Sequence, residues 1–185
     1  TQPADDAGGL AVSMKMQGSI DNLKGAANNV ANAISFLQVQ DGILENIGNI
    51  ISRLSELKGL STDVLKSSSD IETYNSEAAD LASQLGSLRG SKCNDVFLFG
   101  DANGAGGTKA VTVGSSSINI TQTDLSNAGT SSLVSTTGTL DISTIDSVDE
   151  SVGANVGDYT TDFTTTQISE ILSKVAAARA TNGGE

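Results

Sequence analysis

The most reactive side chain in this sequence is the thiol of Cys93, which directly follows Lys92. A neighbouring ammonium group can stabilise a thiolate, so the pair could in principle support nucleophilic chemistry. That chemistry also needs a base or a second thiol, and the chain contains no histidine and no other cysteine. The lack of histidine also excludes Ser-His-Asp triads and His-Glu-x-x-His zinc sites. We therefore expect a structural or incidental role for Cys93.

The glycine-rich residues 100–109 have the composition of a loop that could bind phosphate or calcium. A phosphate-binding P-loop needs lysine directly after its last glycine, whereas Thr108 here separates Gly107 from Lys109. A calcium loop that began at Asp101 would have alanine at its third ligand position. The stretch fits neither site, and we predict a flexible turn after a helix.

Acidic side chains outnumber basic ones by 22 to 10, which gives a net charge of −12. Such a surface repels nucleic-acid phosphates and anionic lipids. Asp149 and Glu150 could imitate a glycosidase pair, but neighbouring residues on a strand point to opposite faces. No stretch approaches the roughly 20 apolar residues that a membrane helix needs. We expect no catalytic residues, no cofactor or metal, and neither nucleic acid nor membrane as a partner.

The elements that must position these residues begin with one long helix. Apolar residues recur at spacings of four and three, which is the pattern of a heptad seam. The seam runs through Met16, Ile20, Leu23, Ala27, Val30, Ile34 and Leu37, and then shifts register to Ile43, Ile47, Ile50, Leu54 and Leu57. Asp5 and Asp6 can begin and cap the helix, and the serines at 67–69 form its first break. We predict one helix of roughly 55 residues, about 80 Å long, within residues 5–66.

Two further stretches have helical periodicity. Asp70 can cap a second helix, and the short break before it predicts an antiparallel helical hairpin. The apolar positions of this helix are Ile71, Tyr74, Ala78, Leu81, Leu85 and Leu88. A third helix is predicted from Thr164 towards Ala180, and it can complete a bundle with the first two. Its apolar positions are Ile168, Leu172 and Val175, flanked by Ile171 and Ala178.

The region between the second and third helices is rich in Gly, Ser, Thr and Asn. Alternating stretches at residues 117–121 and 139–145 favour strands joined by turns. We therefore predict a mainly α protein: an elongated antiparallel rod, built as a coiled-coil-like bundle of three helices, with a small β-rich insert. Residues 1–100 and 163–185 would form the rod, and residues 101–162 the variable insert.

The length of the first helix also predicts assembly. A chain of 185 residues is too short to wrap a helix about 80 Å long. Much of the apolar seam would therefore stay exposed unless other subunits cover it.

The start of the long helix resembles a signature of bacterial flagellins. Residues 5–13 read Asp-Asp-Ala-Gly-Gly-Leu-Ala-Val-Ser, close to the Asp-Asp-Ala-Ala-Gly-Leu-Ala-Ile-Ser of that family. The resemblance continues through Asn-Ala-Ile-Ser-Phe-Leu-Gln at residues 32–38. Ala-Arg-Ala-Thr-Asn-Gly at residues 178–183 is similar to the C-terminal counterpart. The resemblance as a whole covers residues 5–100 and about 20 residues at the C-terminus, whereas the middle of the chain is similar only in composition.

The resemblance implies a structural subunit of the bacterial flagellar filament, without enzymatic activity, that self-associates by helical polymerisation for motility. Flagellins pair N- and C-terminal helices into a rod from which the variable middle projects. The family also implies an export chaperone, secretion through the flagellar apparatus, refolding under a filament cap, and an extracellular location. The terminal segments that form the innermost tube of flagellin filaments are expected to lie outside this chain.

The resemblance further implies a contact patch for a flagellin-sensing Toll-like receptor of innate immunity. The positions that match the motif are Arg53, Leu57 and Glu77. Ser55 departs from the motif, because the family has an arginine there, and the change removes a fork of hydrogen-bond donors. The three matching residues are either a receptor contact or plain rod surface.

Two other functions remain as alternatives. A hook–filament junction protein shares the helical rod, although it usually departs from the Asp-Asp-Ala-Gly-Gly-Leu-Ala type of start. An extracellular adhesin would act through residues 101–162, which contain no cluster of aromatic residues suited to binding sugars. Flagellins with a catalytic zinc-peptidase insert need histidines, which this chain lacks.

Overall fold

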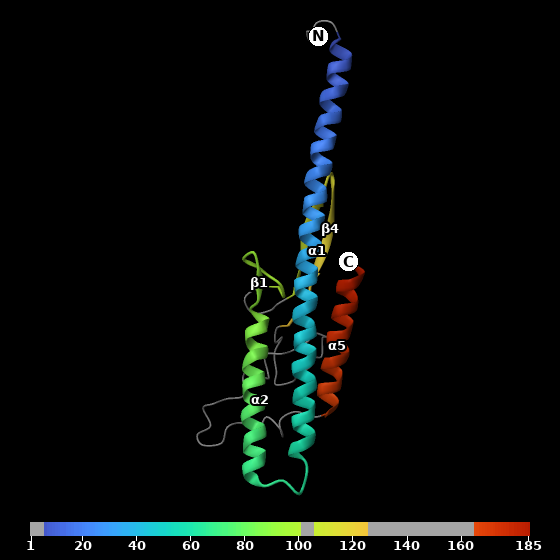
Figure 1. Ribbon diagram of the computed structural model, residues 1–185. Coiled ribbons are helices and arrows are strands. Elements are labelled where there is room, and N and C mark those ends of the chain that lie inside the picture. The colour runs from blue at the N-terminus through green and yellow to red at the C-terminus, as the bar shows by residue number, and fades with distance from the viewer. Residues whose placement is uncertain (1–5, 101–105, 126–164) are drawn as a thin grey trace.

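The computed structural model describes residues 6–100, 106–125 and 165–185, drawn in colour in Figure 1. These residues form an elongated rod of helices with a small β portion, which confirms the predicted fold class. The helices are α1 (Ala7–Ser61), α2 (Ser68–Arg89) and α5 (Thr165–Gly184). The strands are β1 (Lys92–Cys93), β2 (Val96–Phe97), β3 (Gly107–Val113) and β4 (Ser116–Gln122).

The helix α1 spans 55 residues and begins where the sequence predicts. Asp6 is its N-cap, and the Asp6 carboxylate accepts a hydrogen bond of 2.7 Å from the backbone N–H of Gly9. This bond satisfies one of the backbone N–H groups that have no partner within the first turn of a helix. The predicted end at residue 66 is wrong, because α1 ends at Ser61.

Small polar side chains explain this early end of α1. The hydroxyl of Ser61 donates to the carbonyl of Lys58 at 2.9 Å, and that of Thr62 donates to the carbonyl of Gly59 at 2.8 Å. The carboxylate of Asp63 then accepts from the backbone N–H of Leu65 at 3.0 Å. These local bonds offer the backbone an alternative to the helical ladder. The break therefore covers residues 62–67.

The predicted N-cap of α2, Asp70, is wrong. Ser67 is the N-cap, and Asp70 is the third helical residue of a capping box rather than the cap itself. The backbone N–H of Asp70 donates to the Ser67 hydroxyl at 3.3 Å, and the N–H of Ser67 donates to the Asp70 carboxylate at 3.0 Å. Hydrogen bonds from Ser67 lower the pKa of Asp70. Ser68 and Ser69, predicted as part of the break, already belong to α2.

Figure 1 shows α2 and α5 flanking the C-terminal half of α1, and both run antiparallel to it. This arrangement confirms the helical hairpin and the three-helix rod. One apolar cluster lies between the helices. Its members are Leu44, Ile47, Ile50, Ile51, Leu54 and Leu57 of α1, Ala78, Ala82 and Leu85 of α2, Ile168, Ile171 and Val175 of α5, and Leu98, Phe99 and Leu125 from the loops.

The short hairpin of β1 and β2 was not predicted from the sequence. Its turn is made by Asn94 and Asp95, whose φ angles are 50° and 62°. Asn and Asp tolerate this left-handed region better than other non-glycine residues, and two such residues make the tight turn that matches strand twist. The pair Asn-Asp was the available signal.

The strands β3 and β4 form the second antiparallel hairpin, which lies along the middle of α1 in Figure 1. The predicted strand at residues 117–121 is confirmed as part of β4. The predicted turn at residues 100–109 is partly wrong, because β3 already begins at Gly107. The predicted strand at residues 139–145 and the pair Asp149 and Glu150 lie outside the described residues.

A core substitution tests the packing of this rod. Leu85→Ala in α2 removes a side chain that is fully buried, so we expect it to lower the free energy of unfolding by about 2–5 kcal/mol. Val64→Ala, at an exposed position, should change it by less than about 0.5 kcal/mol. Urea unfolding followed by circular dichroism measures both values. Equal effects of the two substitutions would contradict the described core.

Candidate assembly and recognition surfaces

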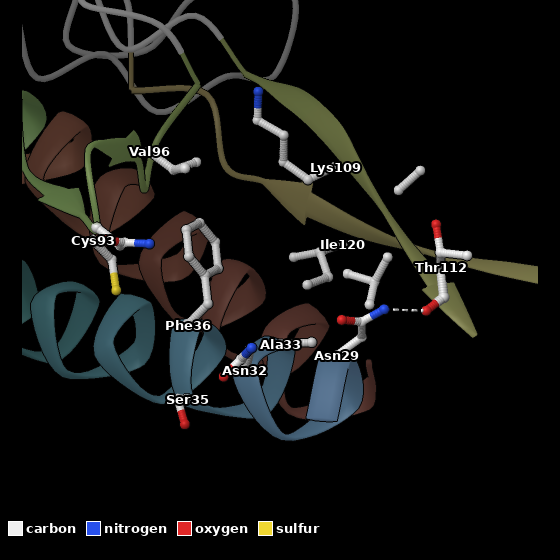
Figure 2. A pocket seen from close by; sticks show the side chains of 13 residues that line it. Asn29, Asn32, Ala33, Ser35, Phe36, Cys93, Val96, Lys109, Thr112 and Ile120 are labelled. Atoms are coloured by element: carbon white, nitrogen blue, oxygen red, sulfur yellow. Dashed lines mark hydrogen bonds between the residues drawn. The ribbon is translucent and has the colours of Figure 1, made fainter. Parts of the chain in front are cut away.

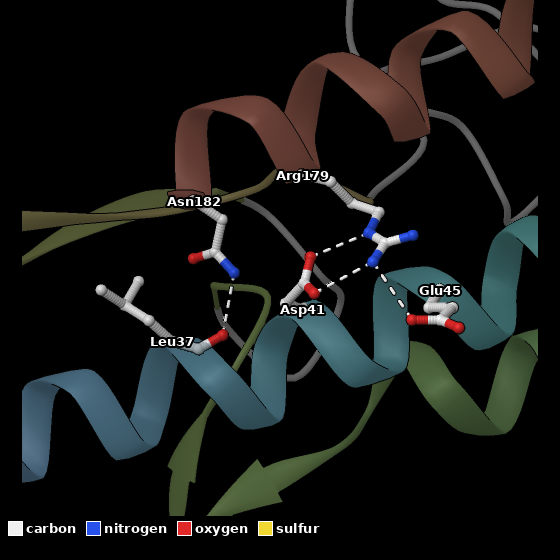
Figure 3. A network of polar contacts seen from close by, with 5 residues as sticks. All are labelled: Leu37, Asp41, Glu45, Arg179 and Asn182. Carbon is white, nitrogen blue, oxygen red and sulfur yellow. Dashed lines mark hydrogen bonds and ion pairs between the residues drawn. The ribbon is translucent and has the colours of Figure 1, made fainter. Parts of the chain in front are cut away.

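Arg179 fastens α5 to α1 over a long separation in sequence. Its Nε and one terminal nitrogen donate to the two carboxylate oxygens of Asp41 at 2.8 and 3.1 Å, and the same terminal nitrogen reaches Glu45 at 3.1 Å. Figure 3 shows this fork beside Asn182, whose amide donates to the carbonyl of Leu37 at 2.8 Å. The bidentate geometry fixes the position of α5 along α1.

These contacts change the acidity of the groups involved. The hydrogen bond from Arg179 lowers the pKa of Asp41, and the bond to Asp41 raises the pKa of Arg179. Both side chains are more than one third exposed, so solvent screens the pair. The cluster therefore specifies geometry more than it adds stability.

A second ion-pair cluster joins α1 to α2, and it contains two of the three residues predicted as a receptor patch. Arg53 Nε donates to Glu77 at 2.6 Å, and a terminal nitrogen of Arg53 donates to Glu56 at 2.6 Å. The bond to Arg53 lowers the pKa of Glu77, and the bonds to Glu77 and then Glu56 raise the pKa of Arg53. The structure thus brings Arg53 and Glu77 together on the rod surface.

Leu57, the third predicted patch residue, lies beneath this surface. Its side chain is 0% exposed and belongs to the core between the helices. Another molecule therefore cannot contact Leu57 in the described arrangement of the helices. The sequence had already placed Leu57 in the second register of the seam, which was the signal for its burial.

The N-terminal half of α1 carries an exposed row of apolar side chains, which we call the α1 stripe. It consists of Val12, Met16, Ile20, Leu23 and Ile34. Met16 is 64% exposed and Leu23 68%, so these residues of the first register of the predicted seam are not covered by the described elements. The exposure of the seam confirms the sequence prediction. An apolar row of this length marks an interaction surface.

Part of the α1 stripe borders an open depression on the surface of α1 itself. The lining residues are Val12, Lys15, Met16, Ser19, Ile20 and Leu23.

A larger pocket of about 610 Å³ lies between α1 and the two β-hairpins. Figure 2 shows Phe36 rising from α1 towards Val96 and Ile120, with Cys93 on the β1 side. The hairpin of β3 and β4 closes over this space through a hydrogen bond of 2.9 Å from the Asn29 amide to the carbonyl of Thr112. Cys93 is half-buried there, and the lining contains neither a carboxylate nor a second thiol.

The geometry offers no other site for chemistry in residues 6–100, 106–125 and 165–185. No group of three or more Cys, Asp or Glu side chains within these ranges is arranged to hold a metal ion. None of the helices described is long and apolar enough to cross a membrane. The fold and the surface thus define an elongated helical rod with an exposed apolar stripe.

Comparison with known proteins identifies the family. Residues 1–103, more than half of the chain, match the family described as the bacterial flagellin N-terminal helical region. The chain therefore belongs to the bacterial flagellin family, whose members are structural proteins.

Individual relatives agree with this assignment. The chain is 38% identical over 81 residues to the flagellar filament 31.3 kDa core protein of Treponema maltophilum, and the match covers 44% of this chain and 28% of that protein. It is 28% identical over 158 residues to the flagellin of Halalkalibacterium halodurans, covering 81% of the chain and 57% of the relative. It is 29% identical over 132 residues to the B-type flagellin of Pseudomonas aeruginosa, covering 70% and 26%. The chain thus spans less than two thirds of the length of each relative.

The two ion-pair clusters predict a specific dependence of stability on pH. The folded-state pKa values of Asp41 and Glu77 are lowered, so their contribution to stability is present above the unfolded values near pH 4 and is lost as pH falls through the folded values. We expect Asp41→Asn with Glu77→Gln to be less stable than the unsubstituted chain at pH 7. The difference should shrink steadily as the pH falls from about 5 to below 3.

Thermal unfolding at a series of pH values measures this difference. Asp80→Asn is the matched control, because Asp80 forms no ion pair in the part of the chain that the structure describes. A deficit of the double variant that stays constant down to pH 2 would contradict the assigned ion pairs.

Proposed function

We propose that this chain is the rod segment of a structural subunit of the bacterial flagellar filament, without enzymatic activity. The observation that carries the proposal is the α1 stripe on a chain of the flagellin family: an apolar row at one end of the rod that no described element covers. Relatives named as flagellar filament core proteins support a role in self-association. In this role the stripe and the rod surface are contacts within the filament.

The same proposal includes the route and the location of the protein. As a flagellin, the chain would be exported with an export chaperone, folded under a filament cap, and held outside the cell in the flagellum. Residues 1–100 and 163–185 would form the rod domain, and residues 101–162 the variable region. Seven-residue strands β3 and β4 within that region support its β-rich character.

The alternatives predict different behaviour. A hook–filament junction protein would be present in few copies per filament. An adhesin would bind glycans through residues 101–162, and the described strands of that region, β3 and β4, carry no aromatic side chain. The α1 stripe favours the filament subunit, because an adhesin acting through the insert has no need of an apolar row on the rod.

A chimera tests the filament role. We expect filaments, and swimming, when this chain replaces the segment that it matches in the Halalkalibacterium halodurans flagellin, in cells that lack their own flagellin. Electron microscopy of the cells gives the readout. The matched control is the same chimera with Ile47→Pro, which breaks α1 inside the core. A folded, secreted chimera that never forms filaments would contradict the proposal.

We also propose that the receptor patch, if used, consists of the exposed ion pair of Arg53 and Glu77, because Leu57 is buried. Arg53→Ala should then reduce signalling by a flagellin-sensing Toll-like receptor by about tenfold or more, since arginine anchors dominate many interfaces. Lys24→Ala, on the exposed N-terminal half of α1 and outside the patch, serves as the control. A reporter-cell assay with the purified chain measures both, and equal signalling by all three proteins would make these residues plain rod surface.

A further inference from the structure

The turn between α1 and α2 presents two large apolar side chains to solvent. Val64 is 94% exposed and Leu65 is 89% exposed, more than any other large apolar side chain in the described residues. We call these two residues the tip pair. The Asp63 carboxylate accepts from the backbone N–H of Leu65 at 3.0 Å, and the Asp63 carbonyl accepts from the N–H of Lys66 at 3.1 Å. The turn therefore holds the tip pair outward in a defined conformation.

The pocket of about 610 Å³ between α1 and the two β-hairpins, which we call the hairpin pocket, suits such a pair. Its apolar walls come from three elements: Phe36 from α1, Val96 from β2 and Ile120 from β4, as Figure 2 shows. The hydrogen bond from Asn29 to the carbonyl of Thr112 ties the hairpin of β3 and β4 to α1 beside this space. Pockets of about 300–1,000 Å³ hold ligands of drug size, so two aliphatic side chains fit.

The charges beside the tip pair and the hairpin pocket are of opposite sign. Lys109 is the only charged residue among those that line the pocket, and Figure 2 shows it on β3, at the edge away from α1. Asp63 directly precedes the tip pair. Within residues 6–100, 106–125 and 165–185, neither side chain forms an ion pair. Unlike charges at the edge of an interface steer association and fix its register, so a contact between the two surfaces would be favoured by both charge and apolar burial.

The tip pair and the hairpin pocket lie far apart within one chain. The pocket contains α1 residues between 29 and 36, whereas the tip pair follows the end of α1 at Ser61. About 30 residues of nearly continuous helix separate the two surfaces by roughly 45 Å. In the described arrangement, the tip pair cannot enter the pocket of its own chain. A second copy of the chain is therefore needed to bring the two surfaces together.

We propose that the tip pair of one copy docks into the hairpin pocket of another copy, with Asp63 facing Lys109. The proposal rests on the filament function and names one contact that serves it. The contact joins different surfaces on the two copies, so it is heterologous, and heterologous contacts that do not close into a ring generate helical polymers.

The native thiol of Cys93, which lines the hairpin pocket, allows a direct test by disulfide trapping in solution. One copy carries Val64→Cys together with Cys93→Ser, and the other copy keeps Cys93 as its only cysteine. The two are mixed under mild oxidation by a copper–phenanthroline complex, and tags of different mass identify the mixed dimer. Cysteines cross-link only when their Cα atoms come within about 7 Å.

The control mixture replaces Val64→Cys by Ser83→Cys, at an exposed position on α2. The same Cys93 thiol reacts in both mixtures, so its own accessibility cancels from the comparison. We expect the mixed dimer to form about ten times faster with Val64→Cys than with the control. Equal rates in the two mixtures would overturn the proposal.

A double-mutant cycle tests the pairing of Asp63 with Lys109. Asp63→Asn removes the charge but keeps an oxygen that can accept from the N–H of Leu65. We expect Asp63→Asn to slow trapping about threefold against the native pocket and to have no effect against a pocket with Lys109→Met. The same effect against both pockets would show that the two charges do not meet, which overturns the proposed orientation.

Assembly of the chimera described above gives an independent readout. Val64→Ser with Leu65→Ser should raise the critical concentration for filament growth about tenfold, since each removes apolar contact surface, while thermal unfolding stays unchanged because both positions are exposed. An unchanged critical concentration overturns the tip contact and leaves the filament function standing. Failure of the unsubstituted chimera to form filaments overturns the filament function, and disulfide trapping still decides whether the tip pair and the hairpin pocket meet.

Discussion

The rest of this structure depends on a mismatch of helix lengths. The helix α1 has 55 residues, whereas its partners α2 and α5 have 22 and 20. Both partners pack on the C-terminal half of α1, so the core forms there and the N-terminal half keeps its apolar residues at the surface. Isolated helices are marginal in water, so this half relies on tertiary or intermolecular packing for much of its stability.

Polar contacts determine how the shorter elements sit along α1. Apolar packing between helices is tolerant of sliding, but the fork of Arg179 on Asp41 has one geometry. Buried amides act in the same way on the hairpin of β3 and β4. The Gln40 amide donates to the carbonyls of Leu98 and Thr121 at 3.3 and 3.5 Å, and the Gln122 amide donates to the carbonyl of Phe97. A two-stranded hairpin is marginally stable by itself, so these contacts with the rod hold it.

The surface features follow from the same architecture. Ion pairs on the flanks, such as Arg53 with Glu77, stay partly exposed and screened, so they order the surface without dominating stability. Arg53 and the α1 stripe thus lie on different parts of α1, and neither lines the pocket behind the hairpins.

The sequence by itself determined the helices, the hairpin of α1 and α2, and the family, because apolar periodicity, capping residues and a helix-start signature are local in the chain. It also identified Arg53, Leu57 and Glu77, but not their arrangement. Only the tertiary structure decided that Leu57 is buried while Arg53 and Glu77 pair above it, because burial depends on which helix packs on which face. Both registers of the seam are apolar in the sequence. The second register became part of the core because α2 and α5 pack against that part of α1. Contacts such as Arg179 with Asp41, 138 residues apart, have no signal in a single sequence, since no local pattern links side chains at that separation.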